Sequence, residues 1–171
     1  MMGFGNIIAA LVAVAGIMVA SYIFVIGAFY TADTLTTSTR DIQNEKAGFL
    51  RTEIGIVDVV PDGVNIYVTL ENTGHEKLRD YPSMDVFVRY YSPSGILELP
   101  GRLQYTESSP SDDEWTVAGI SPDNINPGVL DPDEKLSIWI KVSRPVKTGS
   151  QNNWLQVTTP NGVSTSKYFD G

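Results

Sequence analysis

The sequence predicts an N-terminal transmembrane α-helix followed by an all-β domain, and two observations carry this fold class. First, residues 7–30 form a run of 24 residues without a charge, and the 12 basic and 20 acidic side chains all lie from Asp33 onward. A helix of that length spans about 36 Å, enough to cross the roughly 30 Å hydrocarbon core of a bilayer. Second, after residue 52 the apolar residues alternate with polar ones, which is typical of short strands. We therefore predict a membrane anchor over 1–30, a polar connecting helix or linker over 31–52, and a β-domain over 53–171.

The apolar run is expected to remain as a single-pass anchor. A cleaved signal peptide has a basic start and an apolar core of about 7–15 residues. Residues 1–5 contain no Lys or Arg, and the apolar run is longer than such a core. Arg40, Lys46 and Arg51 follow the run and by themselves would favour a cytoplasmic domain. Because the domain is long and acidic, and because of the resemblance given below, we expect it outside the cell membrane.

Small residues of the anchor gather on one side of the predicted helix. At about 100° per residue they fall within about 40° of a single line along the helix. Such a stripe lets two membrane helices approach closely, so we predict a helix-packing face, although Gly and Ala are also common in membrane helices generally. The predicted packing residues are Gly5, Ala9, Ala13, Gly16, Ala20 and Gly27.

The connecting segment 31–52 carries a thin apolar line, because Leu35, Ile42 and Phe49 recur every seven residues. Five Thr residues between positions 31 and 39 lower the helix propensity there. We expect a helix that frays in the Thr-rich part and resumes near 41–50. A spacer and a helix–helix contact through the apolar line both remain open.

The β-domain should contain seven to nine short strands with no helical segment among them. Turn signals such as Pro61-Asp62-Gly63, Asn72-Thr73-Gly74 and Pro160-Asn161-Gly162 separate the alternating stretches. This arrangement predicts an immunoglobulin-like antiparallel β-sandwich, without the Cys–Trp–Cys signature of antibody domains. The expected strands are 54–59, 64–70, 84–91, 96–99, 103–106, 115–120, 136–142, 154–159 and 163–169.

Residues of the types that commonly act in catalysis or bind metals are scarce in this sequence. The chain has no Cys and one His, His75, so we expect no enzyme activity, no catalytic residue, no bound cofactor and no zinc site. Acidic clusters at Asp112-Asp113-Glu114 and at Asp131, Asp133 and Glu134 could bind Ca²⁺, but solvated loop acids are the more ordinary interpretation and no metal site is predicted. The net charge of −8 argues against nucleic acid as a partner.

Exposed aromatic side chains and sheet edges remain as possible contact sites. Tyr67, Phe87 and Trp139 occupy strand positions opposite to the apolar stripes. They are therefore our candidate partner-binding surface, with packing in the core as the open alternative.

The order of parts resembles the archaeal type IV pilin-like family, which includes the archaellins and the archaellum accessory proteins of the FlaF kind. The resemblance rests on Met2-Gly3-Phe4-Gly5 before the apolar run, on residues 53–60, and on the strand that ends Leu70-Glu71-Asn72-Thr73-Gly74. Pilins carry a basic residue and Gly where a peptidase removes the leader, whereas here Met2 and Phe4 precede Gly3 and Gly5. This difference favours a retained anchor.

The resemblance implies a structural protein of the archaellum with a stator-like role. It implies an S-layer protein, the accessory protein FlaG and other archaellum components as partners, a homodimeric sandwich, and a location in the cell membrane with the domain in the pseudo-periplasm. Two alternatives remain open. One is a filament subunit, archaellin or pilin, that polymerises through its N-terminal helix. The other is a membrane-tethered solute-binding or enzymatic sandwich, for which the sequence shows no converging polar groups.

Overall fold

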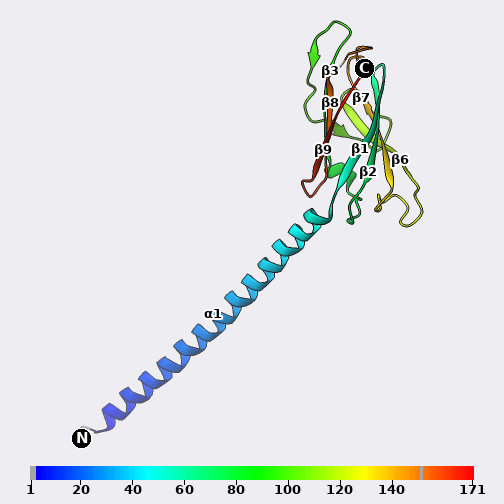
Figure 1. The fold of residues 1–171 in the computed structure, drawn as a ribbon. Helices are drawn as coiled ribbons and strands as arrows, with labels where there is room; N and C mark the ends of the chain where they lie inside the picture. Colours follow the sequence, from blue (N-terminus) through cyan, green and yellow to red (C-terminus); the bar gives the residue numbers. More distant parts are fainter. Residues whose placement is uncertain (1–2, 151) are drawn as a thin grey trace. The chain divides into compact units, whose positions relative to one another are not determined.

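The computed structural model describes residues 3–150 and 152–171. The described residues begin with one unbroken helix, α1 (Gly3–Arg51), which Figure 1 shows. Judged by its internal contacts, the chain divides after Glu45 into two compact units. Nine strands and one short 3₁₀-helix follow in the second unit. Their bounds are β1 (Ile54–Asp62), β2 (Asn65–Asn72), η1 (Tyr81–Ser83), β3 (Asp85–Tyr91), β4 (Leu97–Glu98), β5 (Gln104–Tyr105), β6 (Glu114–Ser121), β7 (Lys135–Lys141), β8 (Asn153–Thr158) and β9 (Ser164–Phe169).

The strands form two sheets packed face to face, which confirms the predicted sandwich. One sheet has the order β1-β2-β7-β6-β5 and the other β4-β3-β8-β9. Figure 1 shows β1, β2, β6 and β7 in one layer and β3, β8 and β9 in the other. The sheets are antiparallel except where β5 pairs with β6 in parallel. The β5–β6 pair is the exception within the predicted antiparallel sandwich, and it arises because the chain crosses from β4 in one sheet to β5 in the other and loops back before β6.

The core is built mainly from the facing sides of the two sheets, together with a few buried loop residues. Alternate residues of the central strands point inward, for example Val68 and Leu70 on β2 and Ile138 and Ile140 on β7, all at most 1% exposed. Trp115 of β6 is fully buried. Among the described residues, the buried apolar side chains all lie between positions 54 and 169, and none belongs to α1. The sandwich therefore closes its own core without the helix.

The Thr-rich part of α1 is helical, so the prediction that the helix frays there was wrong. Each Thr hydroxyl in this stretch donates a hydrogen bond to the carbonyl oxygen four residues earlier, at 2.8–3.1 Å. A hydroxyl paired in this way no longer competes for backbone groups in a non-helical conformation, which is a main reason for the low helix propensity of such residues. The five donors are Thr31, Thr34, Thr36, Thr37 and Thr39.

The first hairpin turns one residue later than the Pro61-Asp62-Gly63 signal suggests. β1 continues through Asp62, which pairs with Asn65. The two intervening residues are Gly63 and Val64, and Gly63 has a φ of +61°, a conformation that glycine adopts at little cost. The structure also differs from the prediction at η1, which is a single 3₁₀ turn in a domain where no helical segment was expected.

Candidate functional site

The structure places the three candidate contact residues on two different sheets. Tyr67 of β2 lies directly opposite Trp139 of β7, and the two rings stack with centroids 6.5 Å apart. Phe87 belongs to β3 in the other sheet. Tyr67 and Trp139 therefore form one surface, and Phe87 is part of a separate one.

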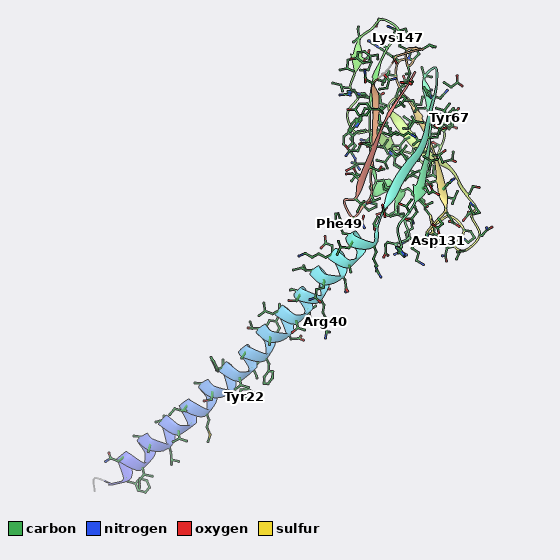
Figure 2. The ribbon with its side chains drawn as sticks, viewed as in Figure 1. Tyr22, Arg40, Phe49, Tyr67, Asp131 and Lys147 are labelled. Carbon is green, nitrogen blue, oxygen red and sulfur yellow. The ribbon has the colours of Figure 1, made fainter. Side chains whose placement is uncertain are left out.

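The first surface is a cross-strand row on the outer face of the five-stranded sheet, which we call the Tyr67–Trp139 pair. Val60 of β1 pairs with Tyr67 and extends the row, and both are substantially exposed, at 49% and 44%. Tyr67 lies on the β1–β2 layer in Figure 2. The indole Nε1 of Trp139 donates a hydrogen bond to Asn65 Oδ1 at 3.0 Å. This bond fixes the ring and leaves a flat, mostly apolar surface suited to protein contact.

The second surface is a groove of about 410 Å³ on the outer face of the four-stranded sheet, which we call the Arg89 groove. Strand register brings Arg89 of β3, Trp154 of β8 and Tyr168 of β9 into one cross-strand row. Leu99 and Tyr168 are the most exposed apolar side chains of the groove, at 68% and 63%. The lining residues are Phe87, Val88, Arg89, Leu99, Gly101, Trp154 and Tyr168.

Arg89 lies against an aromatic ring and has few hydrogen-bond partners. Its guanidinium carbon is 6.0 Å from the ring centroid of Tyr168, a cation–π distance. One terminal nitrogen reaches the backbone oxygen of Asn152 at a long 3.5 Å. The buried Nε has no hydrogen-bond partner among the residues that the structure describes. The groove therefore offers a cationic group with free donor capacity in apolar surroundings.

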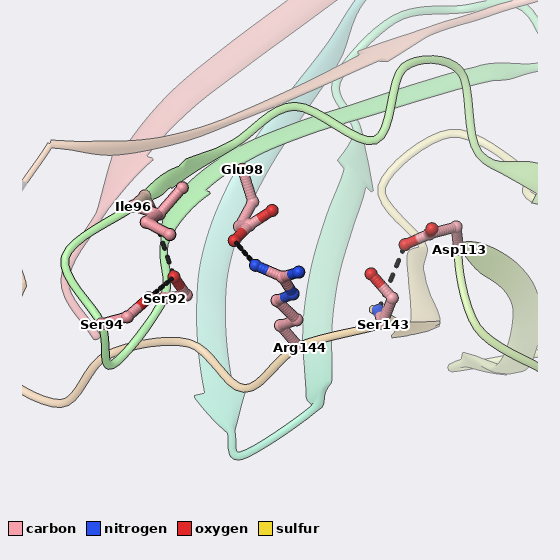
Figure 3. A network of polar contacts seen from close by, with 7 residues as sticks. All are labelled: Ser92, Ser94, Ile96, Glu98, Asp113, Ser143 and Arg144. Carbon is pink, nitrogen blue, oxygen red and sulfur yellow. Dashed lines mark hydrogen bonds and ion pairs between the residues drawn. The ribbon is translucent and has the colours of Figure 1, made fainter.

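Polar contacts hold the segment that carries Leu99 beside the groove. The carboxylate of Glu98 on β4 accepts a hydrogen bond from Arg144 Nη1 at 2.9 Å, and Figure 3 shows this pair. In the same figure, Ser92 Oγ donates to the carbonyl of Ile96 at 3.1 Å within the turn between β3 and β4. Three residues after Leu99, the Arg102 side chain forms an ion pair with Asp85 of β3. The segment between β4 and β5 is therefore fixed on both sides of Leu99.

The acidic clusters hold loops together. Asp131 and Glu134 are almost fully buried, at 4% and 3% exposure, so the interpretation as solvated acids was wrong for them. The Asp131 carboxylate accepts two hydrogen bonds from the Asn126 amide at 2.9 Å, and the Glu134 carboxylate accepts one from the Asp131 backbone N–H at 3.0 Å. Across residues 3–150 and 152–171, no three His, Asp or Glu side chains converge as a metal site would require. His75 is exposed in its loop.

The sequence pattern did not single out Arg89, Trp154 or Tyr168 as candidate contact residues. Each sits at an outward position of an alternating strand that the sequence does predict. The missing information was the register, because only the pairing of β3 with β8 and of β8 with β9 brings the three side chains into one row.

The described residues combine one long apolar helix with a two-sheet β-sandwich that carries exposed aromatic side chains on its surface. Within the described residues, α1 is the one helix long and apolar enough to cross a bilayer, which is compatible with membrane anchoring. The archaeal-type flagellin family matches residues 3–169, and the chain belongs to this family. An uncharacterized protein of Archaeoglobus fulgidus is 30% identical over 170 residues, which cover 98% of this chain and 96% of that protein.

Solved structures show the same fold. The archaellum periplasmic stator protein FlaG from Sulfolobus acidocaldarius matches with a TM-score of 0.51 and 23% identity, covering 69% of this chain and 99% of FlaG. The stator complex of FlaF and FlaG from the same organism matches with a TM-score of 0.50 and 24% identity, covering 69% of this chain and 89% of the matched chain. The archaeal flagellum of Methanospirillum hungatei matches with a TM-score of 0.51 and 14% identity, covering 96% of this chain and 92% of its subunit. The predicted family is thus confirmed, but FlaG as well as the FlaF complex shares the fold.

Proposed function

We propose that this protein is a non-enzymatic accessory component of an archaellum that anchors the motor to the cell envelope. In this role α1 crosses the cell membrane once and the sandwich lies outside, where it binds the S-layer. The sandwich then acts as a stator that resists the torque of the rotating filament. The proposed partners are an S-layer protein, an accessory protein of the FlaG kind, and a second copy of this chain.

Two observations carry the proposal together: this chain belongs to the archaeal-type flagellin family, and its sandwich has the fold of a stator protein. The match covers 99% of the solved FlaG chain and 69% of this chain. Two further features support a binding role for the sandwich. The Tyr67–Trp139 pair and the Arg89 groove lie on opposite sheets, so the domain can contact two partners at once.

A second candidate function is that of a filament subunit. The match with the archaeal flagellum of Methanospirillum hungatei favours it, because it extends over 96% of this chain and so includes the helix. Filament subunits of this kind would pack through the small-residue stripe of α1 that contains Gly16 and Ala20. The intact mass of the native protein separates the two functions, since a subunit loses the residues before the apolar run and an accessory protein keeps them.

Co-sedimentation of the isolated domain with S-layer sheets tests the proposed function. Residues 46–171 form one compact unit with its own core, so this fragment should fold alone. We expect it to pellet with purified S-layer sheets and to remain in solution without them. The heat-unfolded fragment serves as the control for non-specific adsorption. If the folded domain stays in solution with the sheets at every pH from 4 to 8 and at low and high salt, the S-layer role is wrong.

A further inference from the structure

We propose that the Arg89 groove binds an acidic segment of a partner protein, with an Asp or Glu carboxylate on the Arg89 guanidinium and apolar side chains against Phe87, Leu99 and Trp154. The inference rests on the proposed function, since it names the surface and the chemistry by which the sandwich would hold its partner in the envelope. The inference places the contact with this acidic segment on the four-stranded sheet and not on the Tyr67–Trp139 pair of the other sheet.

The charge of the groove is not balanced by the described part of this chain. Four ion pairs occur among those residues, and their cations are Arg51, Arg102, Lys141 and Arg144, so Arg89 takes part in none of them. The buried Nε of Arg89 has no acceptor there either. An unpaired donor in apolar surroundings is unfavourable, and the planar guanidinium fork is well matched to the two oxygens of a carboxylate. Charge complementarity therefore calls for an acidic ligand.

The apolar part of the groove favours a peptide over a sugar. Of the described residues that line it, only Arg89 is charged, and Phe87, Val88 and Leu99 carry no polar side-chain atom. A sugar would need several polar groups to satisfy its hydroxyls, whereas the apolar side chains on either side of an Asp or Glu would fill such a surface. Peptide recognition of this kind combines one charge-assisted contact with neighbouring hydrophobic contacts.

A second copy of this chain is a poorer occupant than a different protein. The most acidic segment near the start of β6 is 107–114, and three of its four carboxylates already have partners. The Asp113 carboxylate accepts the Ser143 backbone N–H at 3.2 Å, Glu114 accepts that of Ser111 at 2.7 Å, and Asp112 lies 3.9 Å from Lys141. Insertion of this loop into a neighbour's groove would break those contacts.

The first test compares Arg89→Gln with the control Arg79→Gln, using purified S-layer protein as the probe. Arg79 is exposed in a loop outside the groove, so both variants remove one positive charge from the domain. Loss of one member of a desolvated charge pair weakens binding by about tenfold or more. We therefore expect a Kd at least about tenfold higher for Arg89→Gln and an unchanged Kd for Arg79→Gln. Because Arg89→Gln could disturb folding, its melting temperature is compared with the wild type, and Tyr168→Ala provides a second groove variant with the same expected weakening.

The second test identifies the occupant by zero-length carbodiimide cross-linking. Arg89→Lys places an amine in the groove, which the reagent joins to a carboxylate only when the two are in contact. We expect mass spectrometry to find this amine joined to an Asp or Glu of the S-layer protein, with no such product from Arg79→Lys. A product that joins two copies of this chain, or no product, overturns the inference. So does binding that periodate oxidation of S-layer sugars abolishes.

The two proposals fail in different ways. If folded Arg89→Gln and Tyr168→Ala bind the S-layer protein as tightly as the wild type, the groove assignment is overturned and the proposed function stands. If the wild-type domain itself does not bind the S-layer protein, the proposed function is wrong and the groove assignment falls with it.

Discussion

At Gly74 the loop that follows β2 packs against the backbone that joins α1 to β1. The backbone N–H groups of Thr73 and Gly74 both donate to the Glu53 carbonyl at 3.0 Å, and His75 N–H donates to the Arg51 carbonyl at 2.7 Å. Asn72-Thr73-Gly74 was recognisable in the sequence as a turn. Its contact with residues 51–53 was not, because it joins segments about twenty residues apart that only the folded sandwich brings together.

Replacement of Gly74 by Ala should destabilise the domain. A Cβ atom at this position would lie 2.6 Å from the Arg51 carbonyl oxygen and closer still to the Glu53 nitrogen, and neither backbone atom can move freely. We expect the free energy of unfolding of fragment 46–171 to fall by about 1–3 kcal/mol in urea titrations, the usual cost of overpacking. Gly55→Ala is the matched control, because a Cβ there meets nothing within 4 Å. Equal stability of the two variants would contradict this contact.

Tyr81 makes the stability of the folded domain depend on pH above about 10. Burial raises the pKa of Tyr81 from the ordinary 10.0 to about 12, while the hydroxyl donates to the Gly128 carbonyl at 3.1 Å. The folded state therefore keeps a proton that the unfolded chain releases above pH 10, so stability is full below pH 10 and is lost as the pH rises toward 12. We expect a loss of roughly 2–3 kcal/mol over this range from Tyr81. The Tyr81→Phe variant should lose less between pH 10 and 12, and an identical pH profile would refute this assignment.

At the scale of elements, the strands were predictable and their pairing was not. Alternation along β2, β3 and β7 marks the inward side chains directly, since burial requires them on one face of each strand. The parallel pairing of β5 with β6 depends on a crossover between sheets, and strands of two residues leave no period to detect. The Arg89 groove was missed for the same reason, because it combines three strands and the crossover segment.

The Thr-rich part of α1 should be helical in a membrane mimetic. The helix runs without a break from the apolar span through this part, where the five hydroxyls bond within the helix, so NMR of the full chain in micelles should give helical Cα chemical shifts through residues 31–51. The loop before β6 serves as the non-helical reference within the same spectrum. Random-coil shifts over 31–39 would contradict the unbroken helix.

At the scale of the whole molecule, the sequence established the order of parts and the family without settling the role. An uncharged run of 24 residues and an alternating domain are enough to predict an anchored sandwich. The fold alone does not separate the possible roles, because a stator protein matches over 69% of this chain and a filament subunit over 96% of it, both at low identity. Which role this chain performs depends on the molecules that it contacts, and the fold of a single chain does not determine these partners.

Fractionation of cells tests the central claim, an envelope anchor in place of a filament subunit, most directly. Filaments are sheared from the cells, and the copy number of this chain is measured by mass spectrometry in the filament and envelope fractions, with the major archaellin as the reference. We predict that the chain remains with the membrane and S-layer, is scarce relative to archaellin, and keeps a peptide that begins at Met1 or Met2. Recovery as an abundant subunit of the sheared filament, cut before the apolar run, would contradict the proposed anchor.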